Sequence, residues 1–349
     1  MSWQATDIFR GAGAVAFAAA TIENRLIFRN LTSITAWRSG QAQFLWATAL
    51  HGDREGGVKL LDGAGNRIIS IIDTGSDSSR KLIVLDPADG KVTWEEPLAV
   101  QPVSAGLATI EETIFVYGYR ADDKQNYLYG YDSAASSQIF VEAVGPGVGI
   151  ASAARLLMMA GNAEVRAYDL RGQLLGTVRA TLPTLYSRSS DIYVHFYDPD
   201  NHQSSEFSWW DGETQSRQGR SIAIDVPERP SVAPGIQRGT AGLILTEGER
   251  GVALLDFHTG QVRWRGLRGV EVRGLCATPY GFVAASESDG GVILTSLDTQ
   301  TGEILERTPA RSVAVYQLLW LGERLIVASI AEAELFAWGE QPPRQGSTA

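Results

Sequence analysis

Short apolar runs separated by polar turns follow one another along the whole chain, and this pattern predicts β-strands. The runs are about four to eight residues long and are bounded by turn formers such as Gly and Asp, which is typical of strands. One arrangement recurs: an apolar strand that ends in Asp, a turn that contains Gly, and a second strand that carries Trp. The clearest copies span Leu82–Trp94 and Val252–Trp264. A recurring unit of this kind indicates a repeat protein.

The Asp of this arrangement returns at intervals of 37 to 46 residues. It stands at Asp86, Asp132, Asp169, Asp211, Asp256 and Asp298. Two more copies keep the pattern without the Asp, at Ile34–Trp37 and Leu335–Trp338. An Asp carboxylate accepts hydrogen bonds from the N–H groups that follow it, and Gly adopts the positive φ that a tight turn needs. Each Asp-to-Gly segment is therefore predicted to join two antiparallel strands.

Two further strand-like runs precede the copies, as at residues 281–285, and four strands repeated about every 43 residues are typical of β-propeller blades. We therefore predict an all-β fold, a single eight-bladed β-propeller of four-stranded antiparallel blades over residues 1–339. Seven blades are the alternative, if two degenerate copies between Asp132 and Asp211 merge. Because one sheet cannot bury both of its faces alone, recurrent tryptophans are predicted to fill the contacts between blades. These are Trp46, Trp94 and Trp264.

The two ends of the chain complement each other in this pattern. The last copy supplies three strands, at about residues 317–321, 324–329 and 335–338, before the polar segment 340–349. Residues 2–9 are predicted to add the missing strand to that blade, since a ring closed by both termini leaves no free sheet edge. The segment 340–349 is predicted to be a disordered tail.

The two clearest copies resemble the quinoprotein-type (PQQ-like) propeller repeat, in which an Asp, a Gly and a Trp follow one another at these spacings. The matching stretches are Leu85–Trp94 and Leu255–Trp264, and the other copies are eroded. Proteins with this repeat include quinone-dependent dehydrogenases and non-enzymatic scaffolds similar to BamB. The dehydrogenases bind a metal and often carry a vicinal cysteine pair, whereas this chain has one cysteine and no recognisable cofactor site. The resemblance thus implies the fold and favours the scaffold group.

Charge and composition narrow the range of partners. The net charge is −10, and only 4 of the 30 basic residues are lysine. A nucleic-acid surface needs clustered Lys and Arg, which the sequence lacks, so no nucleic acid is expected. The single cysteine, Cys276, lies in an apolar stretch and is predicted to be a buried, unreactive thiol.

The location is predicted from the same features. No apolar run approaches the roughly 20 residues that cross a membrane as a helix, and no conventional signal peptide is visible. We therefore expect no membrane span and a cytoplasmic protein. Export by an unrecognised route, as an envelope scaffold similar to BamB, is the alternative.

Carboxylates gather in the loops that we expect to join the second and third strands of each blade. These loops are 29–33, 73–80, 120–126, 161–164, 198–204, 247–251, 286–291 and 330–334, with thirteen acidic residues against five basic ones. The candidate partner-binding residues are Asp73, Asp77, Asp122, Asp123, Asp198, Asp200, Glu247, Glu249, Glu287 and Asp289, and Glu164, Glu332 and Glu334 complete the set. Such loops share one face of a propeller, so that face is predicted to be negative and to bind a basic protein segment. The alternative is that hairpin turns simply favour Asp.

No residue pattern supports covalent chemistry. His195 and His202 flank Asp198 and Asp200, but the spacing matches no zinc or calcium loop, so no metal and no other cofactor is predicted. The sequence also selects no Ser/His/Asp set. We predict a non-enzymatic protein–protein interaction scaffold, or a subunit of a multiprotein complex, that binds partners through propeller-face loops. The alternative is a ligand-binding or enzymatic propeller with a sugar or a quinone-like molecule at its central channel.

Overall fold

A computed structural model describes most of the chain. The described residues are 2–10, 21–22, 25–29, 33–38, 44–50, 58–64, 66–73, 80–147, 149–188, 191–197, 205–224, 232–233, 242–246, 251–256, 261–288, 291–310, 317–321, 324–329 and 332–339. Every regular element among them is a β-strand, and these strands form eight four-stranded sheets with antiparallel neighbours. The predicted all-β class and the four-stranded antiparallel repeat are therefore confirmed.

The chain divides into two compact units, and each is described by itself. Phe17–Pro227 carries five of the described sheets and is called the five-sheet unit. Met1–Ala16 and Glu228–Ala349 together carry the other three and are called the three-sheet unit. The beginning of the chain thus belongs with its last third.

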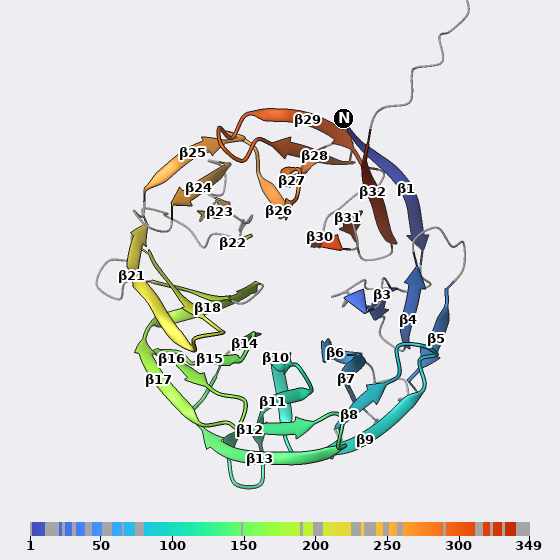
Figure 1. Cartoon of the computed structure of the whole chain (residues 1–349), viewed down its shortest axis with the longest axis vertical. Coiled ribbons are helices and arrows are strands. Elements are labelled where there is room, and N and C mark those ends of the chain that lie inside the picture. The colour runs from blue at the N-terminus through green and yellow to red at the C-terminus, as the bar shows by residue number, and fades with distance from the viewer. Residues whose placement is uncertain are drawn as a thin grey trace, which may run out of the picture. The chain divides into compact units, whose positions relative to one another are not determined.

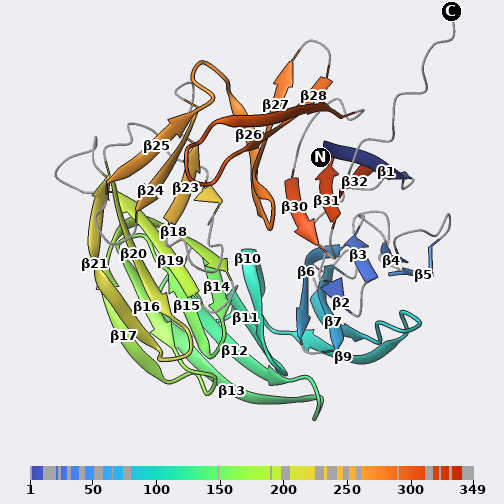
Figure 2. The same ribbon diagram turned by 45° about the horizontal axis from the view of Figure 1, so that its top comes forward.

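In the five-sheet unit the strands of every sheet follow chain order. The sheets are β2 (Thr21–Ile22), β3 (Arg25–Arg29), β4 (Ser33–Arg38) and β5 (Trp46–Ala49); β6 (Val58–Ala64), β7 (Arg67–Asp73), β8 (Arg80–Leu85) and β9 (Val92–Leu98); β10 (Gln101–Ile110), β11 (Thr113–Arg120), β12 (Gln125–Asp132) and β13 (Ser137–Val144); β14 (Gly149–Ala153), β15 (Leu156–Ala160), β16 (Glu164–Tyr168) and β17 (Leu174–Arg179); and β18 (Thr181–Arg188), β19 (Asp191–Tyr197), β20 (Ser205–Asp211) and β21 (Ser216–Ile224). The first strands β6, β10, β14 and β18 contact one another in turn, whereas the fourth strands β13, β17 and β21 lie along the outer edge (Figures 1 and 2).

The core of this unit lies between the faces of neighbouring sheets. Strand β15, Leu-Leu-Met-Met-Ala, is buried along its whole length. Since successive side chains of a strand point to opposite faces, Leu157 packs with Phe115 of the preceding sheet and Met158 with Ile192 of the following one. An uninterrupted apolar run is therefore a strand enclosed on both sides. Residues between Asp132 and Asp211, where a seven-bladed arrangement needs two copies to merge, form two separate sheets.

The three-sheet unit joins the two ends of the chain. Its sheets are β22 (Val232–Ala233), β23 (Gly242–Thr246), β24 (Val252–Asp256) and β25 (Val262–Gly266); β26 (Val272–Thr278), β27 (Gly281–Ser288), β28 (Gly291–Leu297) and β29 (Ile304–Pro309); and β30 (Gln317–Leu321), β31 (Arg324–Ala328), β32 (Glu332–Gly339) and β1 (Ser2–Arg10). Strand β1 pairs with β32, with Trp3 opposite Trp338. The prediction that the N-terminal strand completes the last sheet is confirmed. The segment 340–349 lies outside the described residues.

Strand β1 is held by side chains as well as by its sheet hydrogen bonds. The buried indole of Trp3 donates a hydrogen bond from Nε1 to Ser296 Oγ at 2.7 Å. Its ring lies 4.8 Å from that of Trp338, 6.0 Å from that of Trp320 and 6.3 Å from that of Tyr280, measured between centroids. The N-terminal residues are therefore part of the apolar core of this unit.

The Asp-to-Gly turns form as predicted where the structure describes them. The Asp298 carboxylate accepts the N–H groups of Gln300 and Thr301, both at 2.8 Å. The carboxylates of Asp86, Asp132, Asp169 and Asp211 accept following N–H groups in the same way. The closing glycine has φ +71° at Gly302, whereas Ser136 and Gln215 occupy the left-handed region, with φ 52°, in the eroded copies. The turn residues after Asp256 lie outside the described part.

Tryptophans of the fourth strands lock neighbouring sheets together at these turns. The indole of Trp264 in β25 donates from Nε1 to the carbonyl of Thr299, at 3.1 Å, in the Asp298 turn of the next sheet. Trp46 in β5 likewise reaches the carbonyl of Pro87 at 2.8 Å. Trp94 in β9 lies 5.9 Å, between ring centroids, from Tyr131 of the next sheet. These contacts confirm that the recurrent tryptophans fill the spaces between successive sheets.

Candidate functional site

The segments predicted as acidic loops lie at or between the ends of the second and third strands of the sheets, and some of their residues belong to those strands. Among the ten candidate residues, the structure describes the side chains of Asp122, Asp123 and Glu287. Asp73 ends β7, and its side chain lies outside the described part. The remaining candidates, Asp77, Asp198, Asp200, Glu247, Glu249 and Asp289, lie outside the described residues, as does His202. A single surface containing all ten therefore stays a prediction.

The hairpin between β11 and β12 shows what these acids do where they are described. Arg120 pairs with the Asp123 carboxylate, which also accepts a hydrogen bond from Tyr127 Oη at 2.6 Å. The Arg120 guanidinium stacks over the Tyr127 ring, 3.9 Å from its centroid. These hydrogen bonds, chiefly from Arg120, hold the pKa of Asp123 well below its ordinary value. The negative charge of Asp123 is thus balanced by Arg120 within the same hairpin. The neighbouring Asp122 is exposed to solvent.

Other acids of the predicted set are also paired or buried. Glu164 pairs with Arg166 on the same strand. Glu334 is 1% exposed and lies inside strand β32, so its assignment to a solvent-facing loop was wrong. The reason is strand register: β32 begins at Glu332, and its inward positions continue the sheet core. The local negative charge is therefore weaker than the loop composition indicates.

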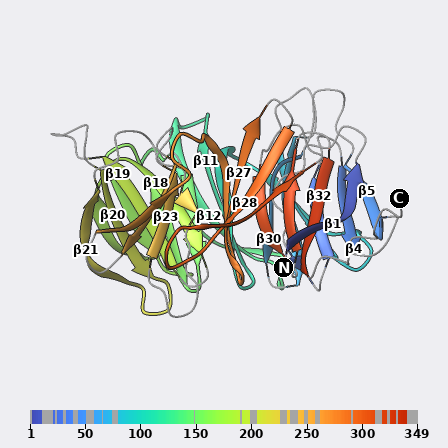
Figure 3. The same cartoon turned by 90° about the horizontal axis from the view of Figure 1, so that it is seen from above.

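Glu287 borders a pocket of about 290 Å³ in the three-sheet unit. Strands β27 and β28, which supply several of its lining residues, lie side by side (Figure 3). Its carboxylate Oε2 lies 3.7 Å from Arg273 Nε, and Arg273 Nη1 lies 2.9 Å from Glu271 Oε1. The turn 267–271 covers one side of the pocket. A candidate acid therefore borders a cavity here.

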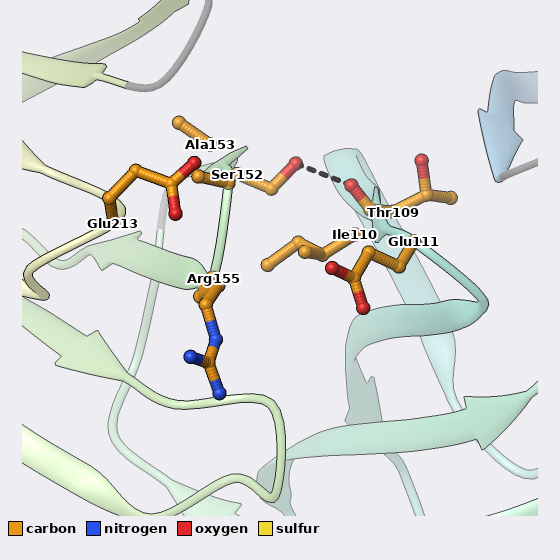
Figure 4. A pocket seen from close by; sticks show the side chains of 8 residues that line it. Thr109, Ile110, Glu111, Ser152, Ala153, Arg155 and Glu213 are labelled. Carbon is orange, nitrogen blue, oxygen red and sulfur yellow. Dashed lines mark hydrogen bonds between the residues drawn. The ribbon is translucent and has the colours of Figure 1, made fainter.

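A second pocket, of about 360 Å³, lies in the five-sheet unit and is open to solvent. Figure 4 shows Glu111, Arg155 and Glu213 around it, on turns of three successive sheets. Its Ser152 hydroxyl donates to the carbonyl of Thr109 at 2.9 Å. Because this hydroxyl is already bonded and the three charged side chains are exposed, the pocket offers few fixed groups to a ligand.

The described residues contain no group of three His, Cys, Asp or Glu side chains placed to hold a metal ion. Cys276 is buried, as predicted. Within the described part of the chain, no helix is long and apolar enough to cross a membrane.

Comparison with known proteins gives a fold but no family. No protein-family model matches the chain, and no curated protein matches it in sequence. Many solved structures match it in shape. They include the computationally designed Ika8 protein, with a TM-score of 0.69 and 14% identity over 95% of this chain and 98% of that one.

Two natural proteins are similar over nearly the same length. BamB from Moraxella catarrhalis has a TM-score of 0.68 and 16% identity over 97% of this chain and 100% of that chain. Sqt1 from Saccharomyces cerevisiae has a TM-score of 0.65 and 13% identity over 97% and 99%. At these identities the likeness shows the β-propeller fold alone.

Polar side chains that no sequence pattern indicated also border the pocket beside Glu287. Ser286, Thr295 and Arg307 border it from three adjacent strands. The available signal was the presence of three hydroxyl residues, Ser286, Thr295 and Ser296, in strand segments that are otherwise apolar, Phe282–Ser286 and Val292–Leu297. That signal does not show which sheet face the hydroxyls occupy or whether a cavity faces them.

Proposed function

We propose that this protein is a non-enzymatic scaffold that binds protein partners through the loops joining the second and third strands of its sheets. The eight described sheets are, in this proposal, the blades of one closed ring of the quinoprotein-type repeat. The pairing of β1 with β32 and the likeness to propeller structures over 95% or more of the chain support the ring. A cytoplasmic location is kept as part of the proposal and rests on the sequence alone.

The contrast between the two ends of the sheets carries the proposal. At one end, the Asp-to-Gly turns are fixed by internal hydrogen bonds and, at two of them, by a tryptophan of the preceding sheet. At the other end, the loops differ in length from sheet to sheet and present carboxylates such as Asp122 to solvent. A rigid frame with variable loops suits recognition of other proteins, because the frame orients the loops without depending on their sequence.

The first test is purification of the tagged protein from its host at low salt, with mass spectrometry of what co-elutes. A stoichiometric protein partner is expected. Its affinity should fall as salt rises from 50 to 500 mM, on the order of ten-fold, because exposed charge pairs are screened. A preparation that carries a bound sugar or quinone-like molecule and no protein would overturn the scaffold in favour of a ligand-binding propeller.

A matched pair of variants tests the loop itself. Asp122→Asn should weaken partner binding about two- to five-fold and reduce its salt dependence, since it removes one exposed charge. Glu142→Gln removes the same charge from an exposed position on β13 of the same sheet and should change neither property. Equal effects of the two variants, or an affinity independent of salt, would contradict partner binding through the acidic loop. The scaffold proposal would then depend on whether a protein partner co-purifies.

A further inference from the structure

A continuous row of aromatic rings lies in the seam between two neighbouring sheets of the five-sheet unit. The rings belong to Tyr127, Tyr129 and Tyr131 of β12 and to Trp94 of β9, and we call this row the aromatic ladder. From Tyr127 to Trp94, successive ring centroids lie 6.1 Å, 6.2 Å and 5.9 Å apart. The ladder therefore runs from the hairpin between β11 and β12 to the outer strand of the preceding sheet.

At its Tyr127 end, the ladder holds a cation of the chain itself. The Arg120 guanidinium stacks over the Tyr127 ring and donates hydrogen bonds to the Tyr127 hydroxyl and to the Asp123 carboxylate. A planar guanidinium carries several N–H donors and also packs against aromatic rings, so it satisfies both groups at once. This end shows that a phenol and a carboxylate side by side bind an arginine in this protein.

The Trp94 end presents the same two kinds of group. Glu96 lies opposite Leu82 in the register of β8 and β9, and Leu82 packs in one cluster with Tyr131. Because directly opposite residues share a face of the sheet, Glu96 faces the seam that holds the ladder. Trp94 lies two residues earlier on the same face. Burial, and then the charge of Glu96, raise the pKa of Tyr131, as expected for a carboxylate close to this phenol.

The charge of Glu96 is not balanced within the described part of the chain. Glu96 is half-buried and makes no ion pair or hydrogen bond with the described residues. Its neighbour Glu95, on the opposite face of β9, pairs with Lys81 at 2.9 Å. Arg80 lies diagonal to Glu96 on the same face, and the two do not pair. A partly desolvated carboxylate gains more from a cation than a fully exposed one does, because the local dielectric constant is lower.

The phenol oxygens at this end can accept hydrogen bonds. Tyr129 and Tyr131 are 6% and 2% exposed, and neither hydroxyl makes a hydrogen bond within the described part of the chain. Neither oxygen is among the polar atoms that are fully closed off from solvent. The hydroxyl is therefore the part of each ring that an incoming donor can reach.

Apolar side chains border this end of the ladder on both outer strands. Val141 of β13 lies opposite Tyr129 and is 44% exposed. Leu98 of β9 is half-buried and packs against the same cluster as the ladder. Strands β9 and β13 are successive fourth strands along the outer edge of the unit (Figure 1). A bound segment with apolar residues beside its cation would therefore cover exposed apolar surface.

We propose that the Trp94 end of the aromatic ladder binds the guanidinium of an arginine in an extended segment of a partner protein. The guanidinium donates to the Glu96 carboxylate and to the Tyr131 hydroxyl, and its plane lies against the exposed part of Trp94. Apolar residues that flank the arginine contact Val141 and Leu98. Lysine fits less well, because an ammonium lacks the planar fork that spans a carboxylate and a phenol. The inference deepens the proposed function and rests on it for the partner being a protein.

Charge complementarity favours a basic partner over a second copy of this chain. Each copy carries a net charge of −10, so two copies repel each other, whereas a basic segment is attracted. Asp122, exposed on the hairpin at the other end of the ladder, extends the negative surface. A neutral apolar segment would cover Glu96 without giving it a counter-charge, which is costly.

Titration of the whole protein with three matched tripeptides tests the proposal by ligand-observed NMR. The probes are acetylated and amidated valine–arginine–valine, its lysine analogue, and its citrulline analogue, which keeps the shape of arginine without the charge. The arginine peptide should bind saturably with a Kd on the order of 1 mM, as its few atoms allow. The lysine peptide should bind about three-fold more weakly and the citrulline peptide about ten-fold more weakly. Equal binding of the arginine and citrulline peptides, or no saturable binding of the arginine peptide, would overturn the proposal.

Variants place the binding at Glu96. Glu96→Gln should weaken binding of the arginine peptide about ten-fold, and Tyr131→Phe, which keeps the ring, about three- to ten-fold. Glu95→Gln removes the same charge one residue away on the opposite face and should leave binding unchanged. An unchanged thermal unfolding midpoint separates loss of binding from loss of folding. Equal effects of Glu95→Gln and Glu96→Gln would contradict the site.

A co-purified partner separates this inference from the scaffold itself. If a protein partner co-purifies and Glu96→Gln leaves its affinity unchanged, the arginine site is wrong and the scaffold stands. If the arginine peptide binds but no protein co-purifies, the scaffold is wrong and the site stands as an arginine site. A dimer of this chain that Glu96→Gln dissociates, measured by light scattering, would assign the arginine to a second copy and overturn the partner protein.

Discussion

Replacement of Gly302 by alanine tests how a tryptophan locks one sheet to the next. Gly302 closes the Asp298 turn with φ +71°. A Cβ atom at this position would lie 2.4 Å from Cε3 and 2.6 Å from Cδ2 of Trp264. Real Cβ atoms do not approach a ring so closely, and this indole is held by its hydrogen bond to the Thr299 carbonyl. The alanine must therefore displace either the turn or the indole.

Gly269 in the same unit provides the control. Its φ is +73°, but a Cβ atom there would meet nothing within 4 Å. Alanine in the left-handed region costs about 1–2 kcal/mol at either position. The collision with Trp264 adds about 1–3 kcal/mol, which is typical of overpacking. Gly302→Ala should therefore destabilise the protein by about 2–5 kcal/mol, and Gly269→Ala by about 1–2 kcal/mol.

The assay is urea unfolding of the unchanged protein, Gly302→Ala and Gly269→Ala, followed by tryptophan fluorescence. The free energies of unfolding are compared if the three proteins unfold with the same m-value. A second comparison uses the Trp264→Leu background, in which the six-membered ring that blocks the Cβ atom is absent. In that background Gly302→Ala should cost no more stability than Gly269→Ala. The substitutions Gly302→Ala and Trp264→Leu should therefore show a coupling energy of about 1–3 kcal/mol. Equal costs of Gly302→Ala and Gly269→Ala with Trp264 present would refute the steric argument.

Three further predictions concern single positions. Ser136→Gly should stabilise the protein by about 0.5–1 kcal/mol in urea unfolding, because Ser136 is exposed and holds a φ of 52° that Gly adopts freely; a loss of stability would contradict this. Trp3→Ala should lower the free energy of unfolding by about 3–5 kcal/mol and promote aggregation, measured by light scattering. The reason is that it removes a 3% exposed indole that holds β1 against the edge of β32. A soluble variant of normal stability would show that β1 is dispensable. Burial, and then the charge of Asp211 directly opposite, raise the pKa of Asp191 above its ordinary value near 3.8. The neutral form is thus favoured in the folded protein, and stability is lost as the pH rises through this raised pKa. Asp191→Asn should therefore add about 0.2–1 kcal/mol at pH 7 and nothing below pH 3.8, which unfolding at a series of pH values checks; a gain that persists at low pH would contradict the charge explanation.

Much of the site could not be anticipated from residue patterns. Composition located the acidic loops, but it could not show that Asp123 is neutralised by Arg120 or that Glu334 points into a sheet core. Strand register decides both, and a shift of one residue reverses which face a side chain occupies. For the same reason Ser286 and Thr295 looked like ordinary strand residues until the register placed them beside Arg307.

The sequence by itself determined the repeat, because its signals act within a few residues. These signals are the apolar run, the Asp after it that accepts N–H groups, and the Gly that adopts positive φ. It also determined that residues 2–9 serve the last sheet, because an incomplete copy at one end and a lone strand at the other are both visible in the pattern. Only the tertiary structure decided which side chains meet across sheets, such as Trp264 with Gly302 and Trp3 with Ser296. Those contacts depend on strand register and on the spacing between whole sheets. Both are set by the packing of many residues together, so no local sequence pattern predicts them.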